Sequence, residues 1–193
     1  MSDKREAILR SSAREIAQHG IRGMRVTEVA ASAGVSTALL YYHFTDRSGL
    51  LDAALKYMTE QSQSYRSLLD TPGDSAWQRL LNHISQEFQD EDVVIETTKA
   101  WNELRAASVY DPELRVSMAS ATTVWRNEIS DSIRAAQAAG EVPDTIDPTS
   151  SAGILVGLME GLGGQWICGE LTVTEIHSLL TTTATTLLKP LAG

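Results

Sequence analysis

Hydrophobic residues recur every three or four positions along nearly the whole chain, and no stretch alternates residue by residue as a half-buried strand would. This pattern predicts an all-α protein. Glycines, prolines and capping residues separate the hydrophobic stretches into successive helices. The predicted helices cover residues 3–20, 26–33, 37–44, 47–71, 74–89, 91–108, 111–140, 147–167 and 172–189.

Several of these helices are preceded by a residue that caps a helix well. Side-chain oxygens of Ser and Asp accept hydrogen bonds from the free amides of a first helical turn. Two of the starts also have proline in that turn, where the missing amide hydrogen does no harm. The predicted caps are Asp3, Ser36, Asp46, Asp111 and Asp147.

The most informative stretch is residues 26–50, where two short helices follow one another closely. The first ends before Gly34, which allows a tight turn, and Ser36 then caps the second. On the second helix Leu40 and Phe44 are four residues apart and share a buried face. Two short helices joined by a glycine turn are typical of a helix-turn-helix reader of DNA.

The outward face of the second helix has chemistry suited to a DNA groove. Tyr41 and Tyr42 carry hydroxyls that can donate to phosphate oxygens. Thr37, Ala38 and Leu39 offer methyl groups and one hydroxyl close to the helix backbone. This set favours contacts with thymine-rich DNA over paired hydrogen bonds to guanine.

The same stretch resembles the DNA-binding region of the tetracycline-repressor (TetR) family. The matching elements are Gly20, Val29-Ala30, Ala33-Gly34-Val35-Ser36, Leu40-Tyr41-Tyr42-His43-Phe44 and Arg47. The resemblance implies a three-helix DNA-binding head, residues 1–48, followed by a helical ligand-binding and dimerisation domain, residues 49–193. It also implies a regulator that binds double-stranded operator DNA as a homodimer.

The chain departs from the family pattern at two places in the head. Arg25 stands where a hydroxyl residue usually caps the second helix, so we expect Thr27 to take the cap. Arg25 is then either a DNA contact or an ordinary exposed side chain. Thr37-Ala38 replaces the frequent Lys-Gly pair, which alters base preference without harming the helix.

By resemblance, Tyr41, His43 and Arg47 are assigned to phosphates and four residues to the groove. The groove residues are Thr37, Ala38, Leu39 and Tyr42. The complete predicted DNA-binding set is Arg25, Thr27, Ser36, Thr37, Ala38, Leu39, Tyr41, Tyr42, His43 and Arg47.

Charge is distributed unevenly along the chain, whose formal net charge is -9. Residues 1–48 hold seven Lys or Arg against five Asp or Glu, and the remaining residues hold nine against twenty. The head is therefore the part that suits DNA. No apolar run reaches the roughly 18 residues of a membrane span, and the charged N-terminus is unlike a signal peptide, so we expect a cytoplasmic protein with no membrane partner. The single cysteine, Cys168, excludes an intrachain disulfide and is expected to be a buried, inert thiol rather than a redox sensor or a bridge between two subunits.

Five glycines, among them Gly153, Gly157, Gly161 and Gly164, interrupt the otherwise apolar helix at residues 147–167. Each costs up to about 1 kcal/mol relative to alanine, a cost that close approach of another helix would offset. By resemblance the last two helices of two subunits form the dimer interface, although close packing inside one subunit is the alternative. The predicted interface residues are Gly153, Gly157, Gly161, Gly164, Ile176, Leu180 and Thr183.

Aromatic, thioether and polar residues of the body are candidates for an effector pocket, with plain core packing as the alternative for each. Tryptophans with nearby carboxylates could hold a quaternary cation. The segments AWNELRAAS, DPELR and MEGLGG resemble the betaine-inhibitor branch of the family without identifying choline as the ligand. The candidate residues are His83, Trp101, Asn102, Glu103, Met118, Trp125, Met159, Gln165 and Trp166.

The sequence therefore predicts a ligand-responsive transcriptional repressor that binds a palindromic operator as a dimer and is released by a small-molecule effector. An activator or a broad-range DNA-binding regulator of the same family is the alternative. No nucleophile with its base, phosphate loop or paired catalytic carboxylates is recognisable, so we expect neither an enzyme nor a cofactor. Histidine and cysteine spacing gives no metal motif, and a plain helix-surface pair is the favoured interpretation of His83 and Glu87.

Overall fold

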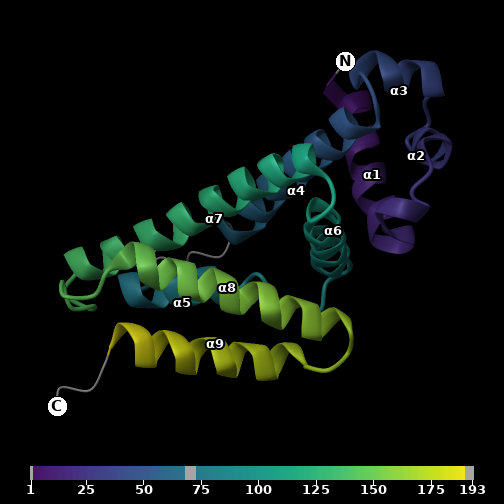
Figure 1. Ribbon diagram of the computed structural model, residues 1–193. Coiled ribbons are helices and arrows are strands. Elements are labelled where there is room, and N and C mark those ends of the chain that lie inside the picture. The colour runs from purple at the N-terminus through teal and green to yellow at the C-terminus, as the bar shows by residue number, and fades with distance from the viewer. Residues whose placement is uncertain (1, 68–72, 190–193) are drawn as a thin grey trace. The chain divides into compact units, whose positions relative to one another are not determined.

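The computed structural model describes residues 2–67 and 73–189, and these residues form helices joined by short loops, without a strand (Figure 1). This confirms the all-α prediction. None of the described helices combines the length and apolarity needed to cross a bilayer. The helices are α1 Ser2–Gly23, α2 Val26–Ser32, α3 Thr37–His43, α4 Arg47–Ser67, α5 Ala76–Ser85, α6 Asp92–Ser108, α7 Pro112–Ala138, α8 Pro148–Ile167 and α9 Val173–Leu188.

Four of the predicted caps are confirmed. The Ser36 hydroxyl accepts from the third amide of α3 at 3.1 Å, and Asp46 Oδ1 accepts from the third amide of α4 at 2.8 Å. Asp111 and Asp147 each accept from two amides in the first turns of α7 and α8. These local bonds explain why the helix starts can be read from the sequence.

Two predicted caps are wrong. The first helix already begins at Ser2, so Asp3 lies inside its first turn, where its charge still favours the positive end of the helix. The second helix begins at Val26, which makes Arg25 its N-cap and places Thr27 within the first turn. Arg25 makes no side-chain cap bond there, so α2 depends on packing for its position.

The predicted ends of two helices, the fifth and the fourth, are not confirmed. The fifth helix stops at Ser85 rather than residue 89, yet Phe88 beyond its end is buried. The hydrophobic spacing that led us to extend this helix to residue 89 therefore indicated that Phe88 is buried, not that it is helical. The predicted end of the fourth helix falls on residues 68–72, outside the described part of the chain.

The prediction that Cys168 is buried is wrong. This residue follows the last turn of α8 as its C-cap and is exposed.

The chain divides into two compact units, and neither follows the chain continuously. The first is Met1–Ser62 with Glu91–Ala121, and the second is Gln63–Asp90 with Thr122–Gly193. The predicted head, residues 1–48, lies inside the first unit, which also contains α6 and the first turns of α4 and α7. The functional division at residue 48 stays a prediction.

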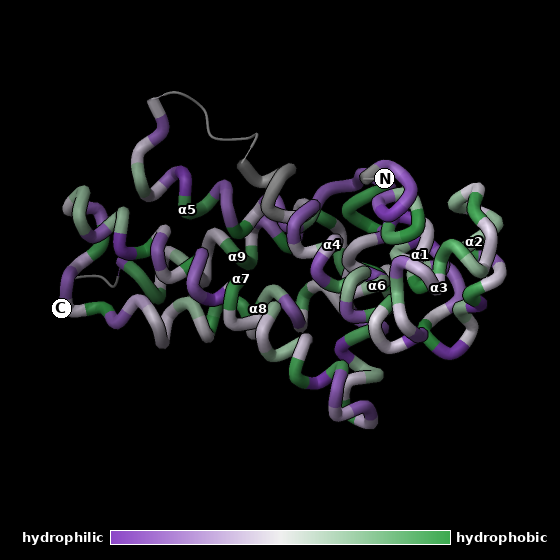
Figure 2. The backbone as a smooth tube through the Cα atoms, turned by 90° about the horizontal axis from the view of Figure 1, so that it is seen from above, coloured by the Kyte–Doolittle hydropathy of each residue, from purple (hydrophilic) through white to green (hydrophobic). Residues whose placement is uncertain are grey.

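In the first unit, α1, α2 and α3 pack together and α6 lies along α1 (Figure 1). Hydrophobic and hydrophilic residues follow one another along the helices, as the green and purple stretches of the tube in Figure 2 show. One continuous core includes Ile8 and Ile16 of α1, Leu40 of α3, Leu50 of α4 and Leu104 of α6, all fully buried. The helix-turn-helix is thus fixed to α6 through a shared core.

In the second unit, α9 packs against both α5 and α8. The His177 side chain on α9 donates from Nε2 toward the Ser85 and Phe88 carbonyl oxygens, each at 3.0 Å, and so satisfies the free end of α5. The Lys189 ammonium lies 4.2 Å from the centre of the Trp77 ring. Both contacts hold α9 against α5.

The helical geometry of α1 is interrupted at Gly20, and the backbone next to this interruption is hydrogen-bonded to α4 and α6. The Gly20 φ of 67° and ψ of 169° are accessible essentially to glycine alone. A Cβ at this position would lie 2.7 Å from Glu103 Oε2. The backbone of the next residue, Ile21, donates its N–H to the same Oε2 at 3.2 Å and accepts through its carbonyl oxygen from the Arg47 guanidinium.

We expect Gly20→Ala to lower the free energy of unfolding by about 3 kcal/mol, because it adds backbone strain and a steric clash. Gly34→Ala is the matched control, since Gly34 also has positive φ but no atom near its Cβ position. It should cost about 1–2 kcal/mol. Urea denaturation followed by circular dichroism measures both.

Combining Gly20→Ala with Glu103→Ala separates the two causes. The cost of Gly20→Ala should shrink when the Glu103 carboxylate is absent, although the hydrogen bond to Ile21 is then lost as well. Equal costs for Gly20→Ala with and without Glu103 would show that the carboxylate is irrelevant to the break.

Candidate nucleic-acid interface

The turn between α2 and α3 has the geometry of a helix-turn-helix. Val29 and Ala30 of α2 are buried, and Gly34 follows with φ of 64°, in the left-handed region that glycine adopts without strain. The Val35 amide then donates to the Ala30 carbonyl oxygen at 3.0 Å, which closes the turn. This rigid turn sets the direction in which α3 leaves α2.

The outward face of α3 is opposite its buried residues, as the sequence predicted. Leu40 and the following Phe44 are buried, whereas Tyr42 is 74% exposed and Tyr41 is 45% exposed. Ala38 is exposed one turn before Tyr42. Phenol rings that extend from a short helix into solvent lose apolar burial, so a partner surface would stabilise them.

The end of α3 is held by a set of aromatic rings. The Tyr42 and His43 rings meet edge to face, with centroids 5.5 Å apart. On the other side His43 lies 6.2 Å from Phe44, and the Arg5 guanidinium lies 5.4 Å from the Phe44 ring centre. These contacts restrict the side chains that would meet a phosphate backbone.

The remaining predicted DNA-binding residues lie around α3. Thr27 and Ser36 are exposed, Leu39 is 36% exposed, and Thr37 is partly buried. Arg25 is exposed at the start of α2. The α2–turn–α3 unit thus brings these predicted residues together.

Arg47 has a structural contact that the sequence did not reveal. Its guanidinium donates to the Ile21 carbonyl oxygen and so links the start of α4 to the end of α1. The side chain is nevertheless exposed. A phosphate contact by Arg47 stays a prediction, and it would have to share the guanidinium with this carbonyl.

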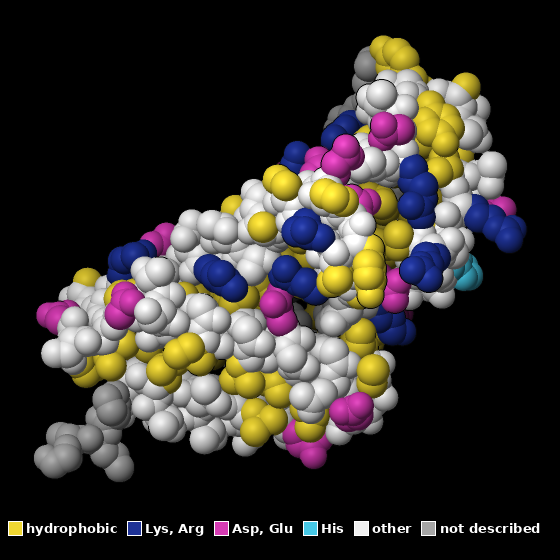
Figure 3. All heavy atoms as spheres, viewed as in Figure 1, with side chains coloured by type: hydrophobic (Ala, Val, Ile, Leu, Met, Phe, Trp, Pro, Cys, Tyr) yellow, Lys and Arg dark blue, Asp and Glu magenta, His cyan; other side chains and the backbone are white. Residues whose placement is uncertain are grey.

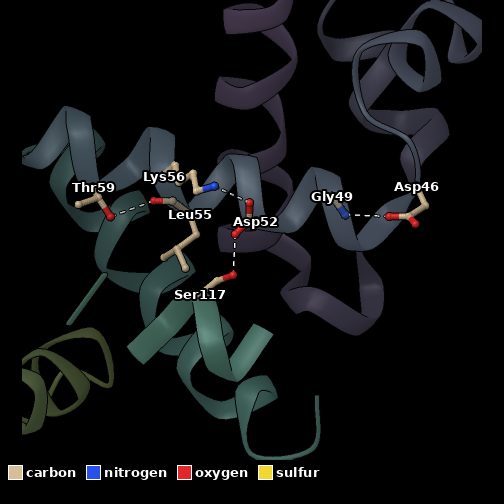
Figure 4. A network of polar contacts seen from close by, with 7 residues as sticks. All are labelled: Asp46, Gly49, Asp52, Leu55, Lys56, Thr59 and Ser117. Carbon is tan, nitrogen blue, oxygen red and sulfur yellow. Dashed lines mark hydrogen bonds and ion pairs between the residues drawn. The ribbon is translucent and has the colours of Figure 1, made fainter. Parts of the chain in front are cut away.

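Polar contacts join the first turns of α4 to the start of α7 within the first unit (Figure 4). Asp52 accepts from the Ser117 hydroxyl at 2.6 Å and pairs with Lys56 at 2.9 Å. One turn earlier, the Ser48 hydroxyl donates to Glu113 at 2.9 Å. The helix that follows α3 is therefore hydrogen-bonded to α7.

The pKa of Asp52 reflects two opposing effects. Burial alone would raise it, but the hydrogen bonds from Ser117 and Lys56, together with the Lys56 charge, lower the pKa below its ordinary value. The carboxylate is thus ionised in the folded protein at neutral pH.

A cavity of about 330 Å³ lies beside this network. Its lining includes the carboxyl-bearing residues Asp46, Asp52 and Glu113, so it disfavours phosphate. Among the described residues, no three His, Cys, Asp or Glu side chains gather as metal ligands. The groups of this cavity serve the α4–α7 contacts described above.

The predicted effector residues fall in both compact units. In the first unit, Met118 is buried, and the Arg105 guanidinium lies 5.5 Å from the ring centre of partly buried Trp101. Asn102 donates to the backbone carbonyl of the preceding helical turn at 2.9 Å. The Glu103 carboxylate binds the α1 break, a structural role that the sequence did not indicate.

In the second unit, Trp166 stacks edge to face on Phe88, with ring centroids 5.8 Å apart. Met159 is buried, Trp125 is partly buried and Gln165 is exposed. His83 Nδ1 lies 3.0 Å from the Ser132 hydroxyl oxygen. Effector binding by any of these residues stays a prediction.

Some of the residues predicted to form the dimer interface face open space, whereas others are buried in the subunit. A Cβ added at Gly153, Gly157 or Gly161 would meet no other part of the described chain within 4 Å. Close packing inside the described subunit therefore does not account for these glycines. Ile176 and Leu180, by contrast, are fully buried in the subunit and are not available to a partner.

The remaining predicted interface residues, Gly164 and Thr183, are partly buried. Ile154 and Leu179 are exposed, although the prediction did not include them. Figure 3 shows hydrophobic and uncharged side chains over α8 and α9 on the face in view. The spacing of hydrophobic residues did not reveal that Ile154 and Leu179 are exposed, whereas Leu180, next to Leu179, is buried.

The long-range polar contacts were also missed. Glu103 is 82 residues from Ile21, and Ser117 is 65 residues from Asp52. Neither pair has a local motif, whereas each helix cap does. Gly20 was the one available signal, because a glycine at the end of a helix indicates an unusual backbone.

Two family models match the chain. The model for bacterial regulatory proteins of the tetR family matches residues 8–54, which include the helix-turn-helix. The model for the C-terminal part of BetI-type transcriptional repressors matches residues 76–189. Together they include α2, α3 and the helices from α5 to α9.

Individual proteins show the same similarity. The HTH-type transcriptional regulator BetI of Escherichia coli K12 is 29% identical over 133 residues, which are 67% of this chain and 68% of that protein. A crystal structure from Rhodococcus sp., assigned to the TetR family of transcriptional regulators, is 47% identical with a TM-score of 0.92, covering 97% of this chain and 100% of that one.

A transcriptional regulator from Saccharomonospora viridis, crystallised in complex with choline, has the same fold. Its identity is 24% and its TM-score 0.84, with 97% of this chain and 98% of that chain covered. All these similarities are to transcriptional regulators, a class of proteins that are not enzymes.

We expect Asp52→Asn to lower the free energy of unfolding by about 1 kcal/mol at pH 7, because it weakens the bonds to Ser117 and Lys56. The effect is modest because the carboxylate is 36% exposed and solvent screens it. A lowered carboxyl pKa stabilises the fold above the ordinary aspartate pKa of about 4, and this contribution is lost as pH falls through the folded pKa.

Thermal unfolding at pH 7 and pH 3 measures this dependence. Asp131→Asn is the control, because Asp131 forms an exposed pair with Arg134 on one helix face. It should change little at either pH. A loss for Asp52→Asn that is equally large at pH 3 would contradict the electrostatic explanation.

Proposed function

Because the chain belongs to the TetR family of bacterial regulatory proteins, we propose that it is a transcriptional repressor that binds a palindromic operator as a homodimer and is released by a small-molecule effector. The observation that carries the DNA-binding proposal is the outward face of α3. There Ala38 and Tyr42 are exposed on one line of a short helix whose other side is fixed in the core. Such a face can approach base edges closely while its flanking hydroxyls meet phosphates.

Dimerisation would supply the affinity that one small head lacks. A single helix-turn-helix makes few phosphate contacts, whereas two heads related by symmetry double them. Such dimers bind half-sites about 34–36 Å apart, one helical turn of DNA. A two-fold protein then requires a palindromic or nearly palindromic operator.

The face of α8 and α9 supports the choice of dimer surface. Gly157 and Gly161 are exposed one turn apart, with open space where a side chain would be. Glu160 is the one charged residue in the sequence of α8, and charged residues are generally depleted at interface centres. Two copies of α8 can approach closely at these glycines and bury Ile154 and Leu179 around them.

The proposal includes a small organic effector held by the second unit. Trp125, Met159 and Trp166 offer the aromatic and thioether surface typical of ligand sites. Choline is the first compound to test, because a regulator with the same fold was crystallised with it. Linkage requires that an effector which weakens DNA binding also binds less tightly to the DNA-bound protein.

Selection from random double-stranded DNA with the full-length protein tests the proposed function. We expect a palindromic sequence to be enriched, with an affinity that falls more than about tenfold between 50 and 200 mM salt. Tyr42→Ala should weaken binding to that sequence by more than about tenfold while leaving the circular dichroism unchanged, because Tyr42 is exposed and its ring contact is with His43, outside the hydrophobic core.

Tyr110→Ala is the matched control, since Tyr110 is 84% exposed in the loop between α6 and α7. It should bind the selected sequence as tightly as the wild type. If Tyr42→Ala also binds normally, α3 is not the DNA contact. Enrichment of a single half-site by a monomer would contradict the dimeric operator.

The double variant Gly157→Leu/Gly161→Leu tests the dimer surface. Leucine favours helix over glycine, so the fold should be retained, but two bulky side chains would separate the paired helices. We expect sedimentation to show a monomer, and full-site DNA binding to be lost. Ala138→Leu, at an exposed position of α7, should remain dimeric, and a dimeric double variant would place the interface elsewhere.

A further inference from the structure

The side chains of α3 cannot make paired hydrogen bonds to a single base. The helix Thr37–His43 contains no Arg, Lys, Asn, Gln, Asp or Glu. Guanine is usually read by Arg or Lys at N7 and O6, adenine by Asn or Gln, and cytosine by a carboxylate. The side chains of α3 therefore cannot recognise guanine, adenine or cytosine in the major groove by these paired hydrogen bonds.

Apolar groups form most of what α3 presents. Ala38 is exposed on the line of Tyr42, and Leu39 beside it is 36% exposed. The Ser36 hydroxyl accepts the Leu39 amide hydrogen at 3.1 Å, so it holds the start of the helix. The surface offered to a groove thus combines the methyl groups of Ala38 and Leu39 with the exposed phenol rings of Tyr41 and Tyr42. The 5-methyl group of thymine is the apolar feature of the major groove that such methyl groups can contact.

We propose that α3 selects its operator through the 5-methyl groups of thymines, which Ala38 and Leu39 contact. The inference rests on the proposed function, because it requires α3 to enter the major groove. Contacts with phosphate position a protein without choosing a sequence. The methyl contacts then carry the sequence preference of this helix.

Deoxyuridine substitution tests the proposal, because it removes the thymine methyl and nothing else. The probe is the sequence enriched from random DNA by the full-length protein, with each thymine replaced in turn by deoxyuridine. We expect at least two positions per half-site at which binding weakens about three- to fourfold. The salt dependence should not change, because the phosphate contacts remain.

The Leu39→Ala variant assigns the methyl contact to α3. At the thymine that Leu39 contacts, deoxyuridine should weaken binding of this variant by less than about 1.5-fold, because one partner of the contact is already gone. Tyr41→Phe is the control: it can weaken binding overall by losing a phosphate contact, but each deoxyuridine penalty should stay as in the wild type.

The outcomes separate this inference from the proposed function. Failure to enrich any sequence overturns both. Enrichment of an operator that tolerates deoxyuridine at every position, or one whose half-sites lack thymine, overturns the methyl readout and leaves the regulator intact. Deoxyuridine penalties that persist unchanged in Leu39→Ala and in Ala38→Gly overturn the assignment to α3.

Discussion

The backbone of Ile21 is the point on which the first unit depends. Its N–H donates to Glu103 of α6, and its carbonyl oxygen accepts from Arg47 at the start of α4. The break at Gly20 turns the backbone so that both partners can reach it. A constrained backbone group left without a partner costs more than the bond itself contributes, so all three segments are tied to one geometry. Since α2 and α3 lie between the break and Arg47 in the chain, the orientation of α3 depends on the Ile21 backbone.

The features that the sequence could predict are those decided by neighbours in the chain. Ser36 caps α3 because its oxygen lies within reach of an amide three residues later, and Leu40 and Phe44 are buried because helical geometry puts them on one face. Glu103 and Arg47 could not be assigned in this way, because their partner is 82 and 26 residues distant. The sequence instead suggested Glu103 as a polar residue of an effector pocket, and the resemblance assigned Arg47 to a phosphate.

The glycines of α8 show how sequence and structure complement each other. The sequence shows five glycines whose cost in a helix needs an explanation, but it cannot decide which helix they approach. The structure shows that a Cβ at Gly157 or Gly161 would meet nothing in the described part of the subunit. It also shows that Ile176 and Leu180, which were predicted to lie in the dimer interface, are buried in the core of the subunit. A period of three to four residues identifies a buried stripe but not what covers it.

An acidic protein that reads DNA must separate affinity from selectivity. The formal net charge is -9, so attraction to phosphates can arise only locally, and screening limits it to charges within about 10 Å. The basic residues near α1–α3 would supply that local attraction, which salt would weaken. Contacts between methyl groups release no counterions, so salt leaves them largely unchanged. If α3 discriminates through Ala38 and Leu39, rising salt should weaken specific and non-specific binding in parallel, and the ratio between them should be preserved.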